Sequence, residues 1–118
     1  MNIDEVDSLL QTIPNVAREL HVTRSASFNR WLIAGHVIAW ERPLSKKDVA
    51  ATGVTGEVLA VHVADVGDKS AWMLAAPRTC FDSPHFAGYP AVLIDVKNAD
   101  PQVLFEIAEA TAERVGAS

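Results

Sequence analysis

The chain has 118 residues, of which 49% are hydrophobic and 21% charged, with a formal net charge of −5. These values predict one globular domain over residues 1–118 and exclude disordered, collagen-like and low-complexity proteins. The single cysteine excludes an internal disulfide, and no apolar run reaches the roughly eighteen residues that a membrane span needs. The acidic N-terminal residues do not read as a secretory signal, so we expect a cytoplasmic protein with no membrane partner.

The first element that the chain predicts is a helix. Apolar residues recur at helical spacing from Asn2 to Ile13, Asn2 is suited to cap the helix, and Pro14 marks its end. Residues 16–20 are ambiguous, because they fit either a second helical turn or a connector.

A β-hairpin is predicted next. Segments 28–34 and 36–41 are rich in β-branched and aromatic residues, and Gly35 between them is suited to a tight turn. Residues 42–56 contain one proline and two glycines and predict a long exposed loop with room for a short strand or helical turn.

The second half of the chain alternates strands and helices. We expect a strand at 57–64, a helix at 69–76, a strand at 91–96 and a final helix that starts at Asp100 and Pro101. This order predicts an α+β fold with two layers, in which an antiparallel or mixed sheet of about five strands packs against N-terminal, middle and C-terminal helices.

The segment from Thr79 to Val96 carries the most distinctive motif. It contains two prolines, a glycine, a histidine and aromatic residues just before a strand, in the order Phe81, Pro84-His85-Phe86, Gly88-Tyr89-Pro90 and Ala91-Val92-Leu93. Together with the strand-glycine-strand pattern of 31–39 and the Pro-x-Val of residues 14–16, this motif resembles the signature of the MmcQ/YjbR-like family, and the resemblance spans nearly the whole chain.

That resemblance implies an α+β domain related to the secretion-chaperone-like and frataxin-like architectures. It also implies a role in DNA binding, which has been proposed for the family because its fold is similar to a double-wing DNA-binding module. The family pattern favours a lysine just after the hairpin glycine, whereas this chain has His36 there.

Positive charge is concentrated between His21 and Lys47. This segment has five basic residues against one acidic residue, Glu41. The sequence therefore predicts that the hairpin and the following loop contact the phosphates of duplex DNA, since such contacts supply most non-specific affinity. An ordinary solvated surface of mixed charge is the alternative interpretation. The candidate nucleic-acid-binding residues are Arg24, Arg30, Arg42, Lys46 and Lys47.

The motif itself offers a second kind of site. His85 and Tyr89 would supply the polar groups, and Phe81 and Phe86 the apolar walls, of a pocket for a small molecule or a protein partner. The structural alternative is that these side chains only support a rigid turn, with Gly88 at positive φ and their polar tips bonded to the backbone.

Catalytic and metal sites are not predicted. The four histidines are far apart in the sequence, and Cys80 has no neighbouring base and no partner cysteine. Trp31, Trp40 and Trp72 are expected in the core or on a sheet face. We therefore expect a non-enzymatic binding protein with no cofactor.

Overall fold

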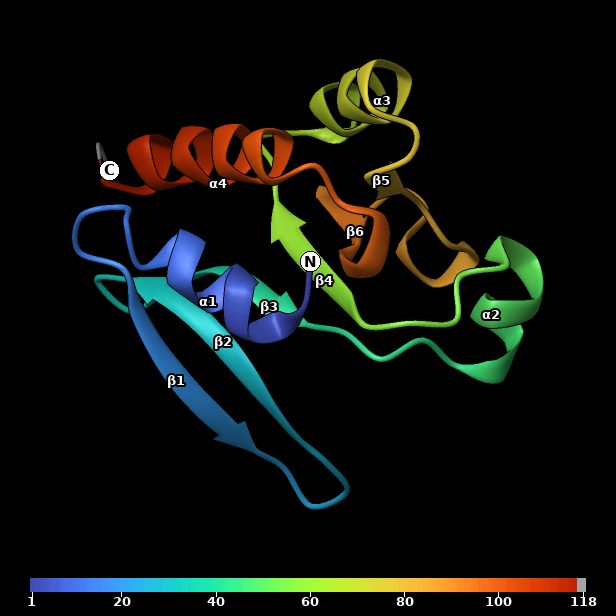
Figure 1. The fold of residues 1–118 in the computed structure, drawn as a ribbon, viewed down its shortest axis with the longest axis horizontal. Coiled ribbons are helices and arrows are strands. Elements are labelled where there is room, and N and C mark those ends of the chain that lie inside the picture. Colours follow the sequence, from blue (N-terminus) through green and yellow to red (C-terminus); the bar gives the residue numbers. More distant parts are fainter. Residues whose placement is uncertain (117–118) are drawn as a thin grey trace.

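The computed structural model describes residues 1–116, and in this range it forms an α+β fold with an open antiparallel sheet (Figure 1). The sheet has six strands, not about five, in the order β1-β2-β3-β4-β6-β5. The strands are β1 (Ala17–Val22), β2 (Ser27–Ile33), β3 (His36–Glu41), β4 (Val58–His62), β5 (Cys80–Phe81) and β6 (Ala91–Asp95). The α-helices are α1 (Ile3–Leu10), α2 (Lys46–Thr52), α3 (Val66–Ala75) and α4 (Pro101–Gly116).

One face of the sheet carries the main core, beneath α1 and α4 (Figure 1). Both helices begin where the sequence predicts, because the Asn2 side chain accepts from the Glu5 amide at 2.9 Å and the Asp100 side chain accepts from the Gln102 amide at 2.9 Å. The apolar side of α4 is buried as predicted, with Leu104 and Ile107 inside the core. We call this side of the sheet the helix face. No helix within residues 1–116 has the length and apolar character needed to cross a bilayer.

The opposite face is only partly covered. Over β4 and β6, a smaller core forms where Phe86 and the α2 segment pack on the sheet. On this face the side chains of β2 and β3 remain half-buried, and those of β1 are mostly exposed. We call this uncovered part the open face, and its residues include His21, Phe28, Arg30, Leu32, Trp40 and His62.

The predicted hairpin is confirmed: β2 and β3 are antiparallel neighbours joined by a tight turn at Gly35. Ile33 pairs with His36, and the two turn residues Ala34 and Gly35 have φ of 50° and 81°. Positive φ at both positions is the requirement of a type I′ turn, which glycine meets without strain.

Two segments, residues 16–20 and the strand β5, differ from the sequence expectation, whereas the helical turn allowed for in the 42–56 loop is present as a short helix. Residues 16–20 are neither helix nor connector, because most of them belong to the edge strand β1. The 42–56 loop contains the helix α2, whose Ser45 side chain accepts from the Asp48 amide at 3.1 Å. The two-residue strand β5 is too short to leave a pattern in the sequence.

Candidate functional site

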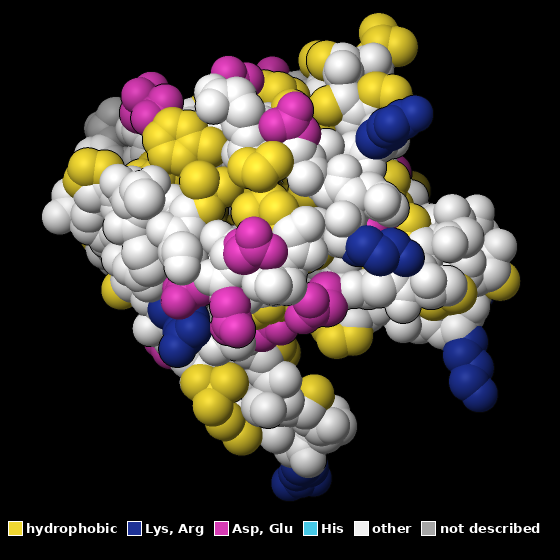
Figure 2. All heavy atoms as spheres, in the orientation of Figure 1, with side chains coloured by type: hydrophobic (Ala, Val, Ile, Leu, Met, Phe, Trp, Pro, Cys, Tyr) yellow, Lys and Arg dark blue, Asp and Glu magenta, His cyan; other side chains and the backbone are white. Residues whose placement is uncertain are grey.

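The structure separates the five predicted nucleic-acid-binding residues into two groups. Arg24 lies in the exposed turn between β1 and β2, whereas Lys46 and Lys47 start α2, in the connection between β3 and β4. Figure 2 shows basic side chains at the ends of two projections, one at the hairpin and one near α2, with acidic side chains between them across the middle of the visible face. These residues do not form one continuous basic surface.

The other two basic residues lie against aromatic rings or carboxylates. Arg30 on β2 forms an ion pair with Glu19 on β1 through its Nη2 atom. Arg42 follows β3, and its guanidinium lies 5.4 Å from the ring centre of Phe86. Both arginines are therefore positioned by contacts within the protein.

Aromatic rings from three parts of the sequence meet at the boundary of the open face. The ring centre of His62 on β4 lies 4.7 Å from that of Trp40 on β3 and 5.9 Å from that of Tyr89 in the motif. Phe86 lies behind them, 6.3 Å from Trp40 and 5.9 Å from Tyr89. These separations are typical of favourable aromatic pairs.

A hollow of about 230 Å³ opens beside these rings. We call it the aromatic pocket, and it is lined by Phe28, Arg30, Val37, Trp40, His62 and Tyr89. Cross-strand pairing explains the arrangement, because Trp40 lies opposite both Arg30 on β2 and Ala60 on β4 and so shares a face with them.

Two polar groups of the aromatic pocket can act on a ligand. The Arg30 guanidinium bonds to Glu19 through Nη2, whereas its buried Nε–H has no acceptor within residues 1–116. Burial lowers the pKa of the His62 imidazole below its ordinary value, and Arg114 adds to this effect, while a hydrogen bond to the Pro90 carbonyl opposes it. His62 is therefore neutral at pH 7, and Arg30 supplies the positive charge.

The motif that dominates the sequence is anchored by a residue that sequence reasoning missed. Lys69 on α3 is 2% exposed, and its Nζ atom donates to the carbonyls of Phe86 and Tyr89, at 2.8 Å each, and to Asp82 Oδ1 at 3.0 Å. The helical spacing holds a signal for it, since position 69 is three residues before Trp72 and so falls on the same helix face.

The predicted motif pocket is only partly formed. Phe81 and Phe86 pack in the smaller core, and Tyr89 is 45% exposed and lines the aromatic pocket. His85 is exposed, with its ring edge-on to Phe86, and it does not line this pocket. Trp40 and His62 line the aromatic pocket together with Tyr89 instead of His85.

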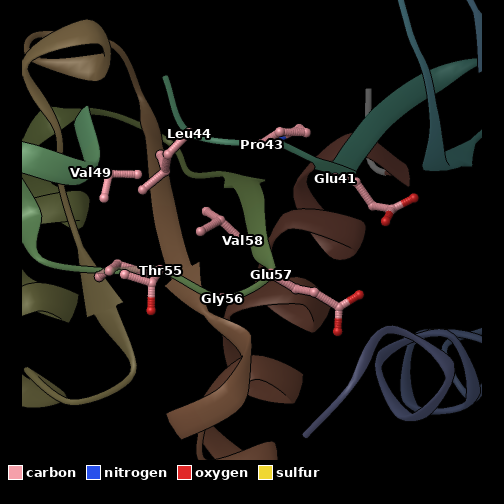
Figure 3. A pocket seen from close by; sticks show the side chains of 9 residues that line it. Glu41, Pro43, Leu44, Val49, Thr55, Gly56, Glu57 and Val58 are labelled. Atoms are coloured by element: carbon pink, nitrogen blue, oxygen red, sulfur yellow. The ribbon is translucent and has the colours of Figure 1, made fainter. Parts of the chain in front are cut away.

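A larger pocket of about 500 Å³ lies between β3, α2 and β4 (Figure 3). Its walls include Leu44, Val49 and Val58. Figure 3 shows the carboxylates of Glu41 and Glu57 directed away from Leu44 and Val49. The Glu41 Oε1 atom is also occupied, because it accepts from the backbone and side-chain nitrogens of Asn29 at 2.7 Å each. This pocket thus lacks polar groups that converge on a ligand, which the aromatic pocket has.

Cys80 is buried, and burial raises the pKa of its thiol to about 11. The thiolate is the reactive form of cysteine, so this side chain is inert at neutral pH. Within residues 1–116, no three histidine, cysteine, aspartate or glutamate side chains lie together as metal ligands.

Comparison with known proteins places the chain among uncharacterised relatives. It is 31% identical over 101 residues to an uncharacterised protein of Mycobacterium tuberculosis and to one of Mycobacterium bovis, and each alignment covers 80% of this chain and 78% of the relative. No family model matches the chain, and no solved structure does. The chain therefore belongs to the same family as these mycobacterial proteins.

Proposed function

We propose that this protein is a binding protein of the MmcQ/YjbR type, whose aromatic pocket takes a planar ring that carries a carboxylate or phosphate. Membership of that type is supported by the Pro-His-x-x-Gly-Tyr-Pro motif of residues 84–90 and by the α+β fold. The observation that carries the ligand proposal is the Arg30 guanidinium, which Glu19 positions and which lines the same hollow as Trp40, His62 and Tyr89.

The rings set the shape of the ligand. Trp40 and Tyr89 present ring surface to the hollow, and the neutral His62 lies between them. Stacking against such rings contributes about 0.5–1.5 kcal/mol for each aromatic pair beyond simple burial. A volume of about 230 Å³ is below the range of roughly 300–1,000 Å³ typical of drug-sized ligands. The ligand group is therefore a single small ring system, free or attached to a larger partner.

The charge of the ligand follows from Arg30. Its Nη2 atom is held by Glu19, so the guanidinium is fixed beside the pocket, and its remaining Nη–H groups can donate to an incoming anion. A hydrogen bond between two charged groups is about twice as strong as one between neutral groups. An acidic ring compound should thus bind more tightly than its neutral analogue.

Titration followed by amide and indole NMR signals tests this proposal, with uridine 5′-monophosphate and benzoate as acidic probes and uridine and benzamide as neutral ones. We expect the acidic probes to shift the signals of Trp40, His62 and Tyr89. Arg30→Gln should weaken their binding about tenfold and leave the neutral probes unchanged. Arg24→Gln removes the same charge from the hairpin tip and serves as the matched control.

The ligand proposal fails if millimolar acidic probes leave these signals in place, or if Arg24→Gln weakens binding as much as Arg30→Gln. If a nucleotide binds but benzoate does not, the acidic group is a phosphate. If single-stranded oligonucleotides bind far more tightly than the mononucleotide, the ring belongs to a polymer.

Duplex DNA is a second candidate partner, and one observation favours it. Exposed basic residues occupy both projections of the molecule, with Arg24 on the hairpin and Lys46 and Lys47 on α2 (Figure 2). Two such projections could contact phosphates on either side of a groove, although the net charge of −5 weakens any general attraction.

Binding of duplex DNA, followed by tryptophan fluorescence at two salt concentrations, tests this second candidate. We expect affinity to fall steeply with salt, and the double change Lys46→Glu/Lys47→Glu should nearly abolish binding. The matched control is Arg78→Glu/Lys97→Glu, which makes the same change in net charge on other exposed residues. A flat salt response, or equal losses in both double variants, would remove DNA as a partner.

A further inference from the structure

The strand β1 leaves one long edge of the sheet unpaired (Figure 1). All six of its residues pair in regular register with β2, and almost all are exposed. Leu20 and Val22, which are 61% and 68% exposed, are among the largest apolar side chains on the surface. An exposed edge with apolar side chains is a template for another strand.

The backbone groups that point out from this edge can be identified from neighbouring hydrogen bonds. The Thr23 amide donates to the Ala26 carbonyl and closes the turn, whereas the Asn29 amide points towards β3, where it donates to Glu41. Hydrogen-bonded and non-hydrogen-bonded pairs alternate in an antiparallel ladder. The pair Leu20–Asn29 is therefore not hydrogen-bonded, and the outward N–H and C=O groups belong to Arg18, Leu20 and Val22.

The usual protections of an edge strand are missing from β1. β1 has no proline. It also has no β-bulge, because the register shift in this part of the sheet lies between β2 and β3. Its two charged side chains are held over the sheet, since Arg18 pairs with Asp7 at 3.1 Å on the helix face and Glu19 pairs with Arg30 on the open face. The opposite edge is the two-residue strand β5, which is too short to pair extensively.

We propose that β1 is an interface between two copies of this chain, in which the strands pair antiparallel about Leu20. In this register Leu20 lies opposite the partner's Leu20, and Arg18 lies opposite the partner's Val22, so that all outward backbone groups meet a partner. Glu19 lies opposite the partner's His21, which allows a hydrogen bond or ion pair on the open face.

Other registers fit less well. A shift of one residue would set the outward N–H and C=O groups of Arg18, Leu20 and Val22 opposite partner residues whose own backbone groups point inward to β2. A shift of two residues in one direction would place Glu19 opposite the partner's Glu19, and like charges directly opposite are destabilising. The same shift in the other direction would separate Glu19 from the partner's His21. The register centred on Leu20 avoids both problems and buries the exposed leucines against each other.

This interface would join two sheets into one, with both open faces on the same side. The two aromatic pockets would then share one surface, although the interface itself does not depend on any ligand. A second copy is a better occupant than an unrelated peptide because the edge is complementary to itself in backbone, apolar and charged groups.

Sedimentation velocity over a range of protein concentrations tests the proposal. We expect a reversible monomer–dimer equilibrium in the unchanged protein and a monomer at every concentration for Leu20→Lys, which places two ammonium groups at the two-fold axis. Leu74→Lys is the matched control, because Leu74 is 86% exposed on α3, which packs on β5 and β6 at the opposite end of the sheet from β1. It should dimerise like the unchanged protein.

Mild oxidation of Leu20→Cys tests the register. Hydrogen-bonded antiparallel neighbours have Cα atoms about 5.5 Å apart, which a disulfide can bridge. We expect a covalent dimer for Leu20→Cys and none for Leu74→Cys, while the buried Cys80 does not interfere. The proposal is overturned if the unchanged protein stays monomeric, if Leu20→Lys dimerises normally, or if Leu20→Cys cross-links no faster than Leu74→Cys.

Discussion

At the scale of single residues, Lys69 decides how the motif of residues 84–90 is held. Its ammonium group is enclosed by two backbone carbonyls and the Asp82 carboxylate, so all three of its donors have partners. The carbonyls belong to Phe86 and Tyr89, on both sides of Gly88, whose φ of 80° turns the chain. One buried side chain thus fixes the two aromatic residues that bound the smaller core and the aromatic pocket.

Removal of this ammonium group should be costly for the fold. We expect Lys69→Met to lower the free energy of unfolding by about 3 kcal/mol, because two carbonyls and a carboxylate each lose their charged donor at a buried position and keep only a backbone N–H. Urea unfolding followed by tryptophan fluorescence measures this change. Lys47→Met, at an exposed position, should change stability by less than about 0.5 kcal/mol. A loss below about 1 kcal/mol for Lys69→Met would mean that the turns hold the motif without the lysine.

At the scale of elements, those with strong local signals were predicted from the sequence. The helix α4 has a capping aspartate, a proline at its first position and apolar residues along one side. The β2–β3 turn has Gly35 where positive φ is required. Each of these signals depends on residues close together in the chain, so neither needs knowledge of tertiary packing.

The edge strand β1 could not be predicted in the same way. A strand is recognised by alternation of buried apolar and exposed polar residues, but nearly every residue of β1 is exposed. Its pairing with β2 and its ion pairs with Asp7 and Arg30 hold it in place, and these contacts come from elsewhere in the chain. The same lack of burial leaves its outer edge free for a second copy.

The aromatic pocket shows the same limit for a site. The motif that contains Phe86 and Tyr89 was recognised, but Trp40 and His62 join it only through the register of β3 with β4 and of β4 with β6. The sequence offered His85 either as a pocket residue or as a support of the turn, because it belongs to the motif, and in the structure its side chain is exposed. Cross-strand register depends on the whole sheet, and local spacing does not reveal it.

At the scale of the whole molecule, His62 connects the layers of the fold. Its ring faces Trp40 and Tyr89 on the open face, and its backbone carbonyl accepts from the Thr111 hydroxyl of α4 on the other side of the sheet. Burial lowers the pKa of this imidazole, and Arg114 of α4 lowers it further, against the opposing hydrogen bond to Pro90. Protonation of His62 is therefore coupled to global unfolding.

The stability of the protein should fall as the pH drops below about 6.5. Because the folded-state pKa of His62 lies below the unfolded value of 6.5, the unfolded chain binds the proton more readily in the interval between the two. The stabilising effect of a neutral His62 is complete above the unfolded pKa and declines as the pH falls towards the folded pKa. The slope from this one group is at most about 1.4 kcal/mol per pH unit.

Urea unfolding at a series of pH values measures this slope. His62→Gln should flatten the curve of unfolding free energy against pH in this interval. His36→Gln, which removes an exposed histidine, is the control and should leave the curve unchanged. If His62→Gln keeps the full slope, another group is responsible for the acid sensitivity of the fold.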